Sequence, residues 1–83
     1  MNDFTRHNLF AAAMDSLGVD TRSNPKALAW AFSGGARGEK PEGISLIAVS
    51  LAVQTVLLDP PEWFAHELPA TPAERLALLK GAL

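Results

Sequence analysis

The two histidines, His7 and His66, have the clearest capacity for chemistry in this 83-residue chain, which lacks cysteine and tyrosine. Imidazole binds metals and transfers protons near neutral pH. Helical zinc sites place histidines in patterns such as His-x-x-x-His or His-Glu-x-x-His, and neither histidine has such a neighbour. His66-Glu67 is followed by Leu-Pro, which ends a helix. Because no serine has an evident base beside it either, we expect solvated histidines, no metal, no cofactor and no catalytic residues.

A second candidate is Asp15-Ser16-Leu17. It resembles the tripeptide that carries phosphopantetheine in acyl carrier proteins, which are also small, acidic and helical. That resemblance implies an exposed Ser16 at the start of a helix, followed by an acidic partner-binding helix. Here Ser16 falls at the end of a predicted helix, directly before Gly18, and the following Val19-Asp-Thr-Arg is not an acidic helix. The spacing therefore favours a helix C-terminus, with an acyl-carrier domain as the alternative.

The third candidate is the glycine-rich stretch from Ser33 to Gly38, which contains Arg37. Successive backbone N–H groups in such a stretch can surround an anion. The stretch lacks the Gly-Lys-Ser/Thr end of a phosphate-binding P-loop, and no predicted strand precedes it. We expect a flexible connection between helices over residues 34–43, with residues 35–42 the most mobile internal segment.

Aromatic residues are the better candidates for a partner site. Trp63 and Phe64 are adjacent on a short, proline-bounded segment, so their side chains must diverge. One is expected to enter the core and the other to remain at least half exposed. Tryptophan is enriched at interface hot spots, and we name Trp63, Phe64, His66 and Trp30 as partner-binding residues. The alternative is ordinary core filling in a small protein.

The elements that position these residues surround one uncharged run, Gly43–Leu58, in which only Ser45, Ser50, Gln54 and Thr55 are clearly polar. A helix of this length spans about 24 Å, short of a hydrocarbon core of about 30 Å. The run therefore predicts the buried central helix of a bundle rather than a membrane span. We expect its Leu51 and Val53 to lie in the core.

Local signals place two helices before this run. Asn2 or Asp3 caps a helix over residues 3–17, and Gly18 ends it. Ser23 or Asn24 caps a second helix, which begins at Pro25 and ends at Gly34-Gly35.

Two capping boxes follow the central helix. Asp59-Pro-Pro-Glu62 predicts a short helix from Pro60 to about Leu68, and Thr71-Pro-Ala-Glu74 predicts the last helix. No alternating β-branched run indicates a strand. The sequence thus predicts an all-α, single-domain bundle (residues 1–83) of four to five helices around a central helix at about 43–58.

Charge and composition narrow the function. The net charge of −2 and pI near 5.5 disfavour nucleic-acid binding, which needs clustered Lys and Arg. We therefore expect a non-enzymatic protein–protein interaction module, such as an adaptor, regulator or chaperone-like subunit, with a protein partner or a homodimer and no membrane association. The alternatives are a small-molecule or acyl-carrier-like binding domain and, behind these, a helical DNA-binding domain. The short apolar stretch after Asp3 does not form a signal peptide pattern, and the Ala/Leu-rich composition is typical of GC-rich bacterial genomes, so we expect a bacterial cytoplasmic protein.

Overall fold

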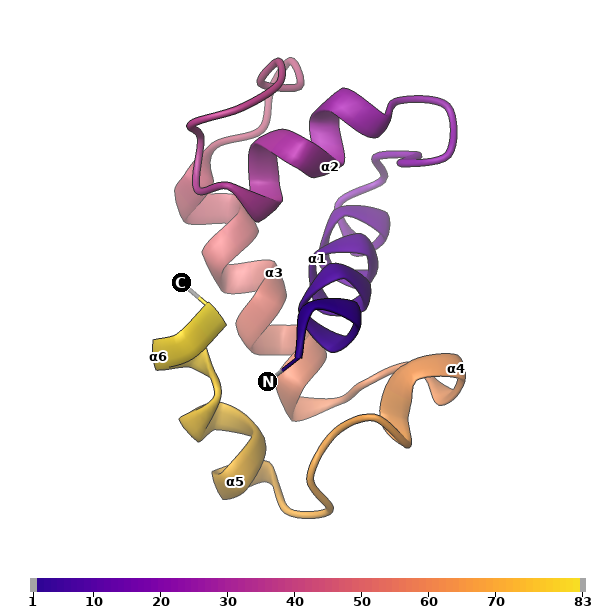
Figure 1. Ribbon diagram of the computed structural model, residues 1–83, viewed down its shortest axis with the longest axis vertical. Coiled ribbons are helices and arrows are strands. Elements are labelled where there is room, and N and C mark those ends of the chain that lie inside the picture. Colours follow the sequence, from indigo (N-terminus) through magenta and orange to yellow (C-terminus); the bar gives the residue numbers. More distant parts are fainter. Residues whose placement is uncertain (1, 83) are drawn as a thin grey trace.

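Helices account for all regular secondary structure in the computed structural model, which describes the backbone of residues 2–82 and the side chains as far as Lys80 (Figure 1). This confirms the all-α prediction for a small helical bundle. Only Leu78 separates the last two segments, so they correspond to the single C-terminal helix expected from the sequence. The helices are α1 (Asp3–Ser16), α2 (Pro25–Phe32), α3 (Leu46–Leu58), α4 (Glu62–Ala65), α5 (Pro72–Ala77) and α6 (Leu79–Ala82).

The first two helices begin and end as predicted. The Asn2 side chain accepts a hydrogen bond from the Thr5 N–H at 2.8 Å. The Asn24 side chain accepts one from the Ala27 N–H at 3.3 Å, and α2 begins at the next residue, Pro25. After α1, Gly18 takes a φ of +80°. Its N–H donates to the Asp15 carbonyl and the Val19 N–H donates to the Met14 carbonyl. These two bonds form a Schellman motif, which satisfies carbonyls left open at the helix end.

The central helix starts later than predicted. Ser45 has an extended backbone and its hydroxyl accepts the Ala48 N–H at 3.1 Å, so α3 begins at Leu46. The connection from α2 therefore continues through Ile44. The apolar run predicts a start at about residue 43, but an N-cap side chain fixes a helix boundary more sharply than hydrophobicity does.

The two predicted capping boxes have different outcomes. Thr71 caps α5 by accepting the Glu74 N–H at 3.3 Å, and its hydroxyl donates to the Glu74 carboxylate at 2.9 Å. Asp59 does not cap the start of α4; it is the C-cap residue of α3, where its N–H donates to the Thr55 carbonyl. Pro61 is the residue before α4, so that helix covers only Glu62–Ala65 rather than 60–68. Two consecutive prolines keep the chain extended here, which separates Asp59 from the helix it was expected to cap.

The core forms where α1 packs against α3 and α2, while α3 also packs against α5. In Figure 1, α1 and α3 run side by side, α2 lies across one end, and α4 and α5 lie at the other. The largest fully buried side chains are those of Phe10, Phe64, Leu9, Met14 and Leu57. Glu67, just after α4, accepts hydrogen bonds from Asn8 at 2.8 Å and Thr5 at 3.4 Å, and these attach the α4 turn to α1.

The two α3 residues expected in the core lie on different faces. Val53 is fully buried, whereas Leu51 is 59% exposed, so the expectation for Leu51 was wrong. Val53→Ala is expected to lower the free energy of unfolding by about 2 kcal/mol, because it leaves a cavity in the core. Leu51→Ala should change it by less than about 0.5 kcal/mol. Urea denaturation of both variants at low protein concentration checks this; equal losses would contradict the assignment of faces.

Candidate functional site

The aromatic pair on α4 divides as predicted. Phe64 is fully buried, whereas Trp63 is 53% exposed, with its ring centroid 5.6 Å from that of Phe64. Successive helical residues point about 100° apart, so burial of Phe64 in the core forces Trp63 outward. Trp63 is thus the one of these two side chains that a partner can reach.

The other two residues named for partner binding, Trp30 and His66, differ in exposure. Trp30 is only 6% exposed and belongs to the core cluster, which removes it as an exposed anchor. His66 is exposed at the end of α4, immediately before the Glu67 side chain that is held by α1. Among the described residues there is no group of three or more His, Cys, Asp or Glu side chains placed to hold a metal ion.

Ser16 is the last residue of α1, and its hydroxyl donates to the Ala13 carbonyl at 2.7 Å. Gly18 and Val19, which donate the two hydrogen bonds of the Schellman motif, follow two and three residues later. This geometry matches the helix-end role that the spacing favours. The start-of-helix position implied by the carrier-protein resemblance is not present at Ser16.

The glycine-rich connection folds back onto α2. The Arg37 N–H donates to the Ser33 hydroxyl at 2.9 Å, so that amide is already engaged within the chain. Gly38 lies so close to the Lys26 carbonyl that a Cβ atom there would overlap it. An exposed ion pair of 3.8 Å joins Lys26 to Glu39. The mobility expected for residues 35–42 stays a prediction, but the connection has three points of attachment to α2 and its end.

One face of α3 exposes three large apolar side chains, and we call it the α3 face: Ile47, Leu51, Gln54, Thr55 and Leu58. Ile47 is 75% exposed and Leu58 is 48% exposed. No charged residue occurs from Gly43 to Leu58. Two of the four polar residues of the run, Gln54 and Thr55, lie on this face, and they are the signal in the sequence that could have marked it as the solvent side.

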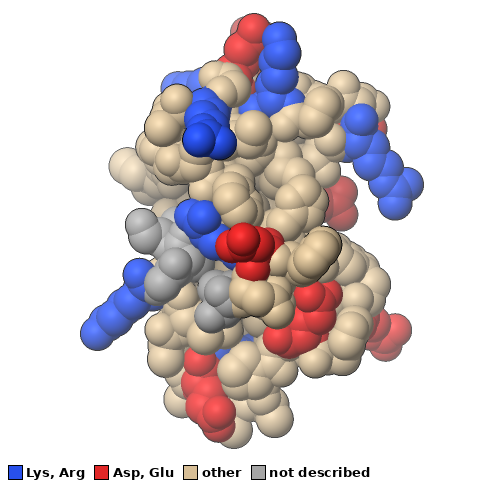
Figure 2. Space-filling view, viewed as in Figure 1, with Lys and Arg blue, Asp and Glu red and all other residues tan. Residues whose placement is uncertain are grey.

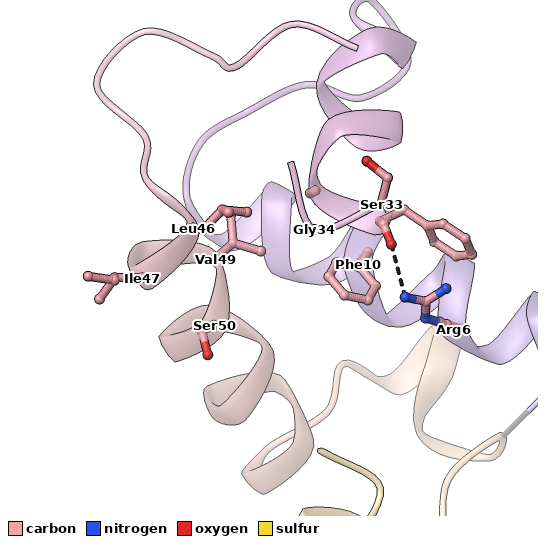
Figure 3. A pocket seen from close by; sticks show the side chains of 10 residues that line it. Arg6, Phe10, Ser33, Gly34, Leu46, Ile47, Val49 and Ser50 are labelled. Atoms are coloured by element: carbon pink, nitrogen blue, oxygen red, sulfur yellow. Dashed lines mark hydrogen bonds between the residues drawn. The ribbon is translucent and has the colours of Figure 1, made fainter. Parts of the chain in front are cut away.

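A hollow of about 380 Å³ adjoins the α2 end of the α3 face, between α1, α2 and α3. In Figure 3, Ile47 points away from the body of the protein, whereas Leu46 and Val49 lie beside the hollow. Arg6 closes its far side. The Arg6 guanidinium carbon lies 4.3 Å from the centroid of the Phe32 ring, and its Nη2 donates to the Phe32 carbonyl at 3.0 Å. The apolar surface thus continues from the α3 face into a depression beside it.

Charge is distributed unevenly outside α3. Residues 59–74 carry four carboxylates and no Lys or Arg. On the face shown in Figure 2, most Lys and Arg side chains lie over the α2 end, and Asp and Glu side chains gather toward the α4 and α5 end. The α3 face is therefore an uncharged strip on a protein with one acidic end.

Comparison of the chain with protein-family models, with curated proteins and with solved structures finds no match in any of the three. Among the described residues, no helix has both the length and the apolar character needed to cross a membrane. The α3 face and Trp63 are therefore the candidate functional surfaces of the chain.

Proposed function

We propose that this chain is a small non-enzymatic helical interaction module that associates through the α3 face, and that its simplest partner is a second copy of itself. The observation that carries the proposal is the exposure of Ile47, Leu51 and Leu58 on one uncharged helix face. Contiguous apolar surface of this kind marks interaction sites in soluble proteins. Burying it in a symmetric dimer is the commonest solution.

The spacing of the α3 face suits helix-to-helix packing. Ile47, Leu51, Gln54 and Leu58 are separated by four, three and four residues, the a/d repeat of a coiled-coil seam. Ser50 and Thr55 flank this seam and are small enough to let a second helix approach closely. Because no residue of α3 is charged, the helices of two identical copies meet without electrostatic repulsion between them.

Gln54 supports a symmetric arrangement. It is the one strongly polar residue in the seam, and its amide both donates and accepts hydrogen bonds. Two copies related by a two-fold axis near Gln54 would pair these amides with each other and place apolar residues on either side. A single polar seam residue commonly fixes the register of paired helices at some cost in stability. The short seam, about 20 Å long, indicates a weak dimer.

Sedimentation equilibrium from micromolar to millimolar protein tests the proposal. The wild-type chain is expected to change from monomer to dimer across this range. Leu51→Glu is expected to keep the chain monomeric throughout, because dimerisation would bury one unpaired carboxylate from each copy in an apolar seam. Leu51 is exposed in the monomer, so the fold itself should be retained, which far-UV circular dichroism would verify.

Phe4→Glu is the matched control. Phe4 is also a large exposed apolar residue, 83% exposed, but it lies on α1. This variant should dimerise like the wild type. A wild-type chain that remains monomeric at millimolar concentration, or equal loss of association in the two variants, would contradict the α3 face as the interface. The bacterial and cytoplasmic setting stays a prediction.

A further inference from the structure

A second surface, which borders the α3 face at Thr55, lies around Trp63. A groove of about 430 Å³ runs between the C-terminal half of α1, the end of α3 and the segment that leads into α4. Ala12, Val56 and Pro61 contribute apolar lining, and Trp63 lies at one side. Trp63 also lines an adjoining hollow, formed with the α1–α2 connection. We call the two together the Trp63 groove.

Trp63 is held in place rather than freely mobile. The buried Phe64 anchors α4 in the core. The Phe64 and Ala65 N–H groups both donate to the Pro61 carbonyl, at 3.0 and 2.9 Å. Proline restricts the backbone before the helix. An exposed indole on such a fixed element presents apolar area with little loss of conformational freedom on binding, which is typical of interface anchors.

Carboxylates line the same groove as this indole. Asp15, Asp59 and Glu62 line the groove beside Trp63. Within the described part of the chain, none of these three carboxylates has a hydrogen bond or ion pair from another side chain. The adjoining hollow adds Asp20, while its one cation is Arg22. The groove as a whole therefore carries an excess of negative charge.

Asp20 is fixed in its ionised form. The Ser23 hydroxyl donates to its carboxylate at 2.7 Å and the Arg22 N–H donates at 2.9 Å. These hydrogen bonds, that of the Ser23 hydroxyl first, lower the pKa of Asp20 below its ordinary value. Its charge is accordingly present throughout the neutral range.

We propose that the Trp63 groove binds a basic segment of a partner protein, with a Lys or Arg side chain lying along the indole and its cationic group among Asp15, Asp59 and Glu62. Tryptophan is the aromatic ring that attracts cations most strongly. The apolar floor suits the aliphatic stem of Lys or Arg, and the carboxylates suit its charged end. The same charges repel phosphate, so the complementarity selects a basic protein segment over a nucleic acid.

A blocked synthetic peptide with the sequence Lys-Leu-Arg-Lys-Leu-Arg is a direct probe. Two-dimensional NMR of the ¹⁵N-labelled chain follows both tryptophan indole N–H signals during a titration with this peptide. The Trp63 signal is expected to shift with saturation, whereas the signal of the buried Trp30 should stay in place as an internal reference. A peptide with Gln in place of Lys and Arg should produce no shift. Raised salt should weaken binding.

Variants identify the groove. Trp63→Ala, followed by calorimetry, is expected to weaken peptide binding about tenfold, as for an interface anchor. Asp59→Asn with Glu62→Gln should weaken it several-fold. Glu39→Gln with Glu42→Gln is the matched control, because it makes the same change in net charge on the glycine-rich connection, and it should leave the affinity nearly unchanged.

Three results would overturn the proposal: an unchanged Trp63 signal at millimolar peptide, equal binding of the Gln peptide, or equal losses in the two carboxylate double variants. The last would mean that net charge alone attracts the peptide. A loss of dimerisation in Trp63→Ala would instead assign the groove to a second copy of the chain. Since Leu51→Glu leaves the groove intact, it should still bind the peptide as a monomer, so the two proposals fail independently.

Discussion

Replacing Arg75 with alanine is expected to lower the free energy of unfolding by about 3 kcal/mol, a large share of what a domain of this size can have. Arg75 lies on α5, but its side chain serves the end of α3. Nε donates to the Leu57 carbonyl at 2.6 Å and Nη2 donates to the Leu58 carbonyl at 3.3 Å. The last carbonyls of a helix lack hydrogen-bond donors within the helix. Arg75 supplies the donors for two of them at the end of α3.

The same guanidinium also holds the connection between α4 and α5. Nη1 donates to the carbonyls of Pro69 and Ala70, at 3.1 and 3.0 Å. One side chain thus joins the end of α3 to the segment from which α5 begins. Hydrogen bonds from a charged donor are worth more than neutral ones. Their loss should release α5 and α6 from α3 as well as lower global stability.

Urea denaturation followed by far-UV circular dichroism measures this effect. Arg75→Lys keeps the positive charge and most of the aliphatic stem, but its ammonium cannot reach all four carbonyls in the planar geometry of a guanidinium. We expect it to recover less than half of the loss. Lys80→Ala removes an exposed cation nearby and should change stability by less than about 0.5 kcal/mol. If Arg75→Lys is as stable as the wild type, charge rather than this set of hydrogen bonds explains the role of Arg75.

Much of the helical arrangement follows from local signals in the sequence. Three residues end or begin helices as their local sequence predicts. Asn24 and Thr71, each directly before a proline, cap the starts of α2 and α5, and Gly18 takes the left-handed conformation after α1. Asp59 has the same local signal as Thr71, yet it does not cap the start of a helix. The difference is that Asp59 follows α3 directly and is separated from α4 by two prolines, so it is the residue that ends one helix rather than the one that starts the next.

The candidate surfaces were less predictable. The divergence of Trp63 and Phe64 follows from their adjacency on a helix, but which of the two enters the core depends on packing. Only Gln54 and Thr55 marked the exposed side of α3 in the sequence, and the three large apolar residues on the same side, Ile47, Leu51 and Leu58, favoured burial instead. The contacts of Arg75 join residues up to 18 positions apart, and the carboxylates around Trp63 come from α1, from the end of α3 and from α4. Such sets depend on tertiary structure, which single-sequence patterns do not contain.

Gly38→Ala is the second substitution with a large expected effect, a loss of about 3 kcal/mol in the free energy of unfolding. Gly38 has a φ of +74°, which disfavours any residue with a Cβ atom. Its added Cβ would overlap the Lys26 carbonyl oxygen and lie 3.1 Å from the Trp30 nitrogen. Both are backbone atoms of α2, so no side chain can rotate to make room. The variant must therefore move the connection away from α2.

Gly43→Ala separates the two causes of this loss. Gly43 has a nearly identical φ of +77°, but nothing lies within 4 Å of the position its Cβ would take. It should lose about 1 kcal/mol, the cost of the left-handed conformation alone. The displaced connection in Gly38→Ala should also expose its amides, so hydrogen exchange over residues 35–42 should rise in this variant and not in Gly43→Ala. Equal losses of stability, or exchange already at the unprotected rate in the wild type, would contradict the packing of this connection on α2.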